Sequence, residues 1–121
     1  MQIIISSGAK WELVTLGGEI TSAEISELEE LLQRFLTVGR YNIILDLAQV
    51  TYIGSAGLSL FIRQTSALRR WERGDLHLAA LSEPVHNLLQ VAGLISEERS
   101  HFSIYPTVEA AQEAAQKRTS Q

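Results

Sequence analysis

Short runs of β-branched and other apolar residues alternate along this chain with longer segments in which apolar residues recur at helical spacing. The strongest run extends from Tyr41 to Asp46 and is almost continuously apolar, as expected for a central strand that is covered on both faces. No internal repeat or low-complexity tract interrupts the alternation. This pattern indicates the α/β class.

Two strands are expected at the start of the chain. Residues 3–6 and 11–16 have strand character, and Ser7-Gly8 between them favours a hairpin. The second strand is expected to end at Gly17 to Glu19, since glycine weakens a strand interior. The sheet is therefore predicted to begin with an antiparallel pair.

A capping pattern predicts the first helix. Thr21 followed by Glu24 has the spacing of a capping box, in which two side chains bond backbone N–H groups at the start of a helix. The apolar residues that follow recur along one helical face: Ile25, Leu28, Leu31, Leu32 and Phe35. Gly39 is expected to end this helix, because glycine commonly follows the last helical residue.

The most informative position is Ser55, where the central strand gives way to a second helix. The first N–H groups of a helix lack intrahelical partners, and the helix dipole places partial positive charge there. A hydroxyl at this junction can cap the helix, which is worth about 1 kcal/mol, or carry a phosphate. Both roles stay open. Gly57 falls inside the first turn, where close packing is favoured over the approach of a partner's backbone as its reason.

The second helix is predicted from Ala56 to about Arg73, with a core stripe of Leu58, Phe61, Thr65 and Leu68. Leu60 and Trp71 flank this stripe, either as the edge of the core or as an exposed patch for a partner. Asp46, at the end of the preceding strand, either orients the serine loop or bonds a local turn, and the local role is favoured. Four arginines fit a solvated face better than a contact with an acidic partner: Arg63, Arg69, Arg70 and Arg73.

The same signals predict the remaining elements. Gly74 ends the second helix, and a strand follows over residues 76–81. Ser82 then caps a helix that Gly93 closes. The last elements are a short strand around residues 102–105 and an alanine-rich helix that Thr107 caps and that runs to about Lys117.

Composition restricts the classes of partner. With 121 residues and no cysteine, the chain is expected to form one domain over residues 1–121, frayed from residue 118, in a reducing compartment. A net charge of −4 argues against a nucleic-acid binder, which usually carries a basic stripe. No apolar run approaches the roughly 18 residues of a membrane span. We therefore expect a cytoplasmic protein that binds other proteins, without direct contact to nucleic acid or insertion into a membrane.

The patterns of serine enzymes and metal sites do not match this chain. A nucleophile elbow needs glycine two residues before the serine, where this chain has Ile53. His77, His86 and His101 are scattered, without metal-binding spacing and without an acid placed beside them. The turn at residues 54–57 lacks the lysine of a phosphate-binding loop. We therefore expect a non-enzymatic module with no catalytic residue, cofactor or metal; a small serine enzyme is the distant alternative.

Several short motifs occur in an order that resembles a known family. They are Gly18-Glu19-Ile20; Asp46-Leu47 followed by Val50, Ile53, Ser55, Gly57 and Leu58; Gly74-Asp75-Leu76; Ser82-Glu83-Pro84-Val85; and Ala92-Gly93-Leu94. Together they resemble the STAS domain, a family that includes the bacterial anti-sigma factor antagonists, over nearly the whole chain. The resemblance implies an α/β fold with a small mixed sheet of about five strands and about four helices, mostly on one side.

The resemblance also implies a phosphorylation switch. In that family the serine at the position of Ser55 is phosphorylated by a partner kinase, often the anti-sigma factor itself, and a serine phosphatase reverses the reaction. The unphosphorylated form binds the partner and releases a sigma factor. The implied partner-binding residues are Glu19, Ile20, Thr21, Gly54, Ser55, Ala56, Gly57 and Leu58.

The chain departs from this family at two positions. Many phosphorylated members have acidic residues where this chain has Gly54 and Thr21. The alternative function is therefore a STAS-like scaffold subunit in a larger regulatory or transport complex, without phosphorylation. The identity of the partner and the oligomeric state stay open.

Overall fold

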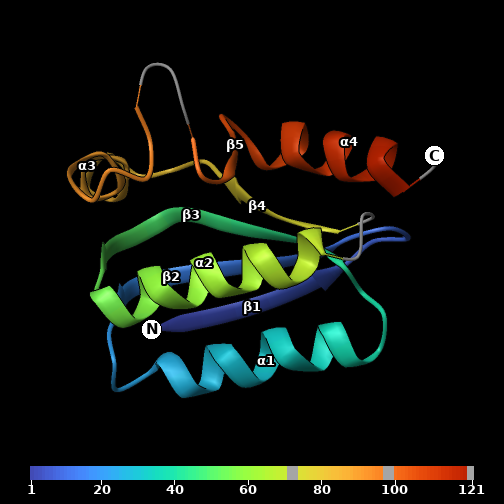
Figure 1. The fold of residues 1–121 in the computed structure, drawn as a ribbon, viewed down its shortest axis with the longest axis horizontal. Helices are drawn as coiled ribbons and strands as arrows, with labels where there is room; N and C mark the ends of the chain where they lie inside the picture. Colours follow the sequence, from blue (N-terminus) through green and yellow to red (C-terminus); the bar gives the residue numbers. More distant parts are fainter. Residues whose placement is uncertain (71–73, 97–99, 120–121) are drawn as a thin grey trace.

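In the residues that the structure describes, five strands form one mixed sheet in the order β1-β2-β3-β4-β5, and four helices pack around it (Figure 1). β1 pairs antiparallel with β2, and the other neighbouring strands pair in parallel. The computed structural model describes residues 1–70, 74–96 and 100–119, so Trp71, Arg73 and the last two residues of the predicted tail lie outside it. The elements are β1 (Gln2–Ser7), β2 (Glu12–Ile20), α1 (Ile25–Thr37), β3 (Asn42–Ile53), α2 (Ser55–Arg69), β4 (Asp75–Ala79), α3 (Glu83–Val91), β5 (Ser103–Tyr105) and α4 (Val108–Thr119). The predicted α/β class and antiparallel start are confirmed.

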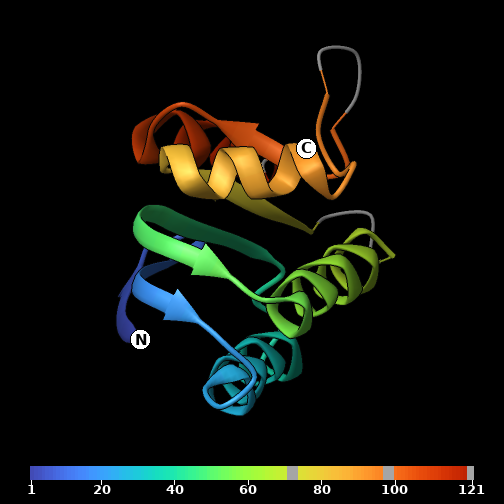
Figure 2. The same ribbon diagram turned by 90° about the vertical axis from the view of Figure 1, so that its left-hand side faces the viewer.

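α1 and α2 pack against each other, with α3 and α4 away from them (Figure 2). One large apolar core includes Leu28 of α1, Phe61 of α2 and Val85 of α3. Because successive strand residues point to opposite faces, Ile44 of β3 faces away from this core. α4 covers that side through a small cluster of Ile44, Ala79, Ala111 and Ala115. The helices therefore lie mostly on one side, as expected.

β3 is the central strand, and it is longer than its apolar run. It pairs with β2 on one side and with β4 on the other, and its first residues are buried. Beyond Asp46 the buried residues are Leu47, Val50 and Ile53, three apart, because the register with β2 shifts in this region. A spacing of three residues differs from the two-residue alternation of a regular strand. The extra length carries the strand to Ile53, two residues before Ser55.

Two predictions near the start of the chain are wrong. β2 does not end at its glycines but continues to Ile20, because Gly17 and Gly18 stay paired with β3 across two register shifts. The capping box is also not formed, since Glu24 is the N-cap of α1 without a side-chain cap bond. Glu24 Oε1 instead accepts a hydrogen bond of 3.0 Å from the amino group of Met1.

The later elements follow the predictions with small shifts. Ser82 is the N-cap of α3 and accepts the Val85 N–H at 3.4 Å, and Thr107 Oγ1 accepts the Ala110 N–H at 3.1 Å. β4 begins at Asp75 and ends at Ala79 instead of at residue 81, because Ala80 adopts a left-handed backbone with φ of 55°. The ends of α1 and α3 lie beside glycines with positive φ, Gly39 and Gly93, as predicted.

One side-chain network joins the hairpin to the loop before β3. Arg40 Nε donates to Glu12 Oε1 at 2.9 Å, and its two terminal nitrogens donate to the carbonyls of Gly8, Ala9 and Trp11. Ser7 Oγ donates to the other oxygen of Glu12 at 2.5 Å. The side chain of Glu12 is 8% exposed, so its negative charge is paired with Arg40 at a position that is largely shielded from water. The sequence offered no signal for this network, since its members lie up to 33 positions apart.

Candidate functional site

The two segments of the predicted site lie side by side at one edge of the sheet. β2 and β3 are parallel, so their carboxyl ends meet there, with Glu19 opposite Tyr52 and Ile20 opposite Ile53. The chain is tied across this edge by the Gly54 N–H, which donates to the Ile20 carbonyl at 2.8 Å. Ligand sites in open α/β sheets commonly form beyond the carboxyl ends of parallel strands. Residues 19–21 and 54–58 therefore form one surface, called the serine surface below.

Ser55 is the first residue of α2 and not its cap. The N-cap is Gly54, with an extended backbone (φ −76°, ψ 171°) and no side chain to bond the first turn. The interpretation of Ser55 as a plain N-cap is therefore wrong by one position. Its side chain is exposed at the surface.

The start of α2 is suited to a negative charge. The first intrahelical bond to Gly54 comes from the Leu58 N–H at 3.1 Å, so the N–H groups before it lack intrahelical acceptors. The first turn contains no acidic residue to offset the partial positive charge of the helix dipole. A phosphate on Ser55 would meet free N–H donors at this position.

The remaining predicted residues differ in accessibility. Glu19 is exposed, whereas Thr21, Gly54, Ala56 and Leu58 are half-buried. Ile20 is fully buried, so its side chain can support the serine surface but cannot touch a partner. A Cβ atom on Gly57 would lie 2.8 Å from Ile53 Cγ2 and 3.1 Å from Ile20 Cγ2, which confirms that Gly57 is required by packing.

Three further candidates are placed by the structure. Asp46 Oδ1 accepts the Ala48 N–H at 3.1 Å, so its role is local and it does not orient the serine turn. Leu60 is fully buried, so it belongs to the core and is not a partner patch. His77 lies in the interior with its Nε2 3.1 Å from Asn42 Oδ1.

The other histidines and acidic residues of the described part of the chain form no further site. His86 and His101 are both exposed. Within residues 1–70, 74–96 and 100–119, no group of three or more histidine, cysteine or acidic side chains could hold a metal ion. Over the same residues, no helix has both the length and the apolar character needed to cross a membrane.

One residue of this edge was missed by the sequence analysis. Tyr52 is 45% exposed, and its ring atom Cε2 lies 3.7 Å from the position of a Cβ atom on Gly54. It therefore borders the serine surface directly. The available signal was an aromatic residue two positions before the Gly54-Ser55 turn, in a stretch that has no strand alternation.

Comparison with known proteins agrees with this fold. The sequence pattern that defines the STAS domain matches residues 6–111. The chain belongs to the STAS domain family. The curated STAS relatives include the anti-sigma-B factor antagonist of Staphylococcus epidermidis, which is 33% identical over 81 residues, or 67% of this chain and 74% of the relative.

Solved structures share the STAS fold at low sequence identity. An anti-sigma factor antagonist from Mycobacterium paratuberculosis has a TM-score of 0.75 and 19% identity, covering 95% of this chain and 93% of that one. The anti-sigma factor antagonist SpoIIAA in its unphosphorylated form has a TM-score of 0.80 and 17% identity, covering 96% and 97%. SpoIIAA of Bacillus in its phosphorylated form has a TM-score of 0.72 and 16% identity, covering 93% and 98%. These likenesses establish the fold of the STAS domain.

Proposed function

We propose that this STAS domain is a cytoplasmic, non-enzymatic anti-sigma factor antagonist that is switched at Ser55. It binds an anti-sigma factor through the serine surface, and a serine kinase, the anti-sigma factor itself or a related protein, phosphorylates Ser55. A serine phosphatase restores the binding form. The observation that carries the proposal is the exposed hydroxyl of Ser55 on the first residue of α2, free of a capping role.

The switch acts at the interface and not inside the fold. Phosphorylation adds about 1.5 to 2 negative charges and three strong acceptor oxygens. The start of α2 accepts such a group locally, so little internal rearrangement follows. A partner whose surface fits the unmodified turn would have to desolvate the phosphate without supplying cations or hydrogen-bond donors to compensate for the lost water. Phosphorylation therefore releases the partner.

The test uses the whole chain and each purified anti-sigma factor that its source genome encodes. Titration calorimetry is expected to detect binding of one of them to the wild-type chain, and Ser55→Glu is expected to raise the Kd at least about tenfold. Incubation with that protein and ATP is expected to add one phosphate, which intact-mass and peptide analysis locate on Ser55.

A matched control is available on the same helix. Ser59 is also exposed and lies one turn after Ser55. Ser59→Ala is expected to leave both binding and phosphorylation unchanged, whereas Ser55→Ala is expected to abolish the added mass. Binding that is equally tight in wild type and Ser55→Glu would contradict the proposed switch.

A second candidate function is supported by the residues around the serine. Gly54 and Thr21 stand where the family resemblance implies acidic residues in phosphorylated members, and neither of them is acidic. In this second function the STAS domain is a scaffold subunit that assembles a larger complex without phosphorylation. Stoichiometric complex formation that is indifferent to Ser55→Asp, together with unmodified Ser55 in protein recovered from its own cells, would favour the scaffold.

A further inference from the structure

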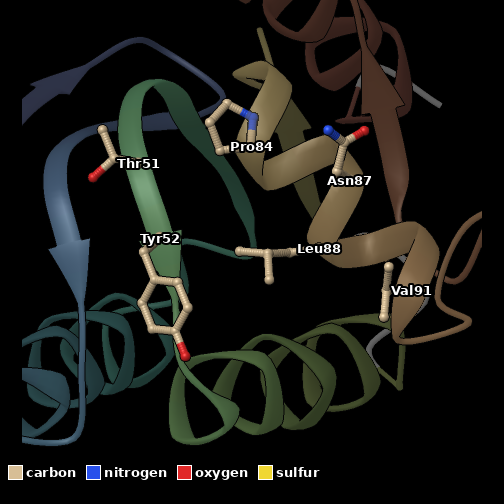
Figure 3. Close-up of a pocket in the computed structure, with 6 residues that line it drawn as sticks. All are labelled: Thr51, Tyr52, Pro84, Asn87, Leu88 and Val91. Atoms are coloured by element: carbon tan, nitrogen blue, oxygen red, sulfur yellow. The ribbon is translucent and has the colours of Figure 1, made fainter.

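An apolar groove lies between the end of β3 and α3. It has a volume of about 360 Å³ and is lined by Thr51, Tyr52, Pro84, Asn87, Leu88 and Val91. Figure 3 shows the side chain of Leu88 between those of Tyr52 and Val91. None of the six lining residues is charged. The walls of the groove are therefore suited to an apolar group.

The groove exists because α3 has more apolar surface than its own core uses. Val85 and Leu89 point inward and are fully buried. Pro84, Leu88 and Val91 form a second stripe at helical spacing on the neighbouring side. Val91 is 89% exposed, the highest value among the large apolar side chains in the described residues. A contiguous exposed apolar surface of this kind often marks a site of contact with another protein.

The groove is continuous with the serine surface. Tyr52 lines the groove, and its ring lies 3.7 Å from the Cβ position of Gly54, the cap of the helix that begins at Ser55. The hydroxyl of Ser82 fixes the other wall, since it donates to the Val50 carbonyl at 2.5 Å and caps α3. A protein that docks on the serine surface can therefore reach the groove without crossing a gap.

The charged residues of the segments that form the groove and the serine surface are both glutamates. Glu83 precedes Pro84 on α3, Glu19 is the strand neighbour of Tyr52, and both are exposed. No lysine or arginine occurs in residues 19–21, 51–58 or 83–91. A segment with lysine or arginine beside an apolar side chain would match both the apolar floor and the acidic rim.

A small metabolite fits the groove less well. Small-molecule sites of about 300–1,000 Å³ usually contain a few polar groups that fix the ligand's orientation. Here the polar groups of the lining are the hydroxyls of Thr51 and Tyr52 and the amide of Asn87, all three on exposed residues, and none of them is charged. The lining therefore favours an apolar side chain over an ionic ligand.

We propose that this groove receives an apolar side chain, flanked by lysine or arginine, from the same anti-sigma factor that binds the serine surface. The inference rests on the proposed function, and it adds α3 to the interface. The groove holds the partner whereas Ser55 controls its release, so the two parts of the surface are separable by mutation. Hot-spot residues of interfaces are enriched in tyrosine, so Tyr52 is the expected hot spot of this interface.

The test measures the Kd of the anti-sigma factor that binds the wild-type chain, using full-length variants. Val91→Asp is expected to raise the Kd at least about tenfold, and Tyr52→Ala by a similar factor. Glu83→Lys is expected to weaken binding by a factor that shrinks as salt is added. Because Val91 is largely exposed, the fold should be retained, which circular dichroism and urea unfolding check.

Val38→Asp is the matched control. Val38 is also a valine, is 71% exposed and is the C-cap of α1, a helix whose C-terminal end lies on the side of the molecule away from α3 (Figure 1). Its substitution is expected to leave the Kd within about twofold of wild type. If Val91→Asp and Tyr52→Ala bind as tightly as wild type while Ser55→Glu does not, the groove proposal fails and the proposed function stands.

Two other outcomes overturn the groove proposal in different ways. If no anti-sigma factor binds the wild-type chain, the proposed function and the groove proposal both fail. If sedimentation shows a dimer of the wild-type chain that Val91→Asp dissociates, without any effect on the Kd for the anti-sigma factor, the groove is occupied by a second copy instead.

Discussion

At the scale of single residues, the serine surface depends on a position that has no side chain. Gly57 is buried in the first turn of α2, where Ile53 and Ile20 leave no room for a methyl group. Both isoleucines end the strands that carry the site. The packing of Gly57 therefore sets how closely α2 approaches the sheet, and with it the position of Ser55.

We expect Gly57→Ala to lower the free energy of unfolding by about 1–3 kcal/mol. Alanine is the better helix former by roughly 1 kcal/mol, but overpacking a close contact with Ile53 costs more than this gain. Urea unfolding measures the difference. Ser59→Ala, on an exposed position of the same helix, is expected to change stability by no more than about 0.5 kcal/mol. Equal stability of Gly57→Ala and wild type would show that the contact with Ile53 relaxes freely.

At the scale of elements, α2 begins without a side-chain cap. Gly54 has the extended backbone of an N-cap but offers no oxygen to the first turn, and that turn has no acidic residue. A Cβ atom at this position would have its nearest contact at 3.5 Å, an ordinary distance. A residue with a capping side chain would therefore fit at position 54, so the absence of a cap is not a steric requirement.

We expect Gly54→Asp to raise the free energy of unfolding by about 0.5 kcal/mol, because aspartate bonds the free N–H groups and complements the dipole. Thermal unfolding at low and high salt measures the gain, of which the dipole part should shrink with salt. Gly54→Ala fits the same backbone without a cap oxygen and should show no such gain. If phosphorylation at Ser55 is also faster in Gly54→Asp than in Gly54→Ala, an acidic residue immediately before the serine assists the kinase.

At the scale of the whole molecule, Arg40 connects parts of the chain that are distant in sequence. Its guanidinium group joins Glu12 to three carbonyls of the hairpin turn. The hairpin, the end of α1 and the start of β3 therefore share one largely buried charge pair.

We expect Arg40→Ala to lower the free energy of unfolding by about 2–3 kcal/mol. The substitution leaves the carboxylate of Glu12 largely buried and without its cation, which costs more than losing an exposed pair. Arg63→Ala is the matched comparison, since Arg63 pairs with Glu29 at 3.5 Å between side chains that are 60% and 46% exposed. Its loss should cost no more than about 0.5 kcal/mol. Similar urea midpoints for the two variants would contradict the role of burial.

The order and type of the elements were predictable, because local signals specify them. The Ser82 cap and the glycines after α1 and α3 act within a few residues of their own position, and each was found where expected. The capping box at Thr21 failed for the opposite reason. Glu24 bonds the amino group of Met1, 23 residues away, so a tertiary partner replaced the local one.

The sequence by itself determined the class of fold and the family and singled out Ser55 as the candidate switch, because periodicity and motif order are properties of the linear chain. Only the tertiary structure decided that Gly54 and not Ser55 caps α2, that Ile20 supports the site from beneath, and that α3 adds a groove beside it. These features depend on the pairing of β2 with β3 and on the seating of α3 against Val50, which join residues about 30 positions apart in the sequence.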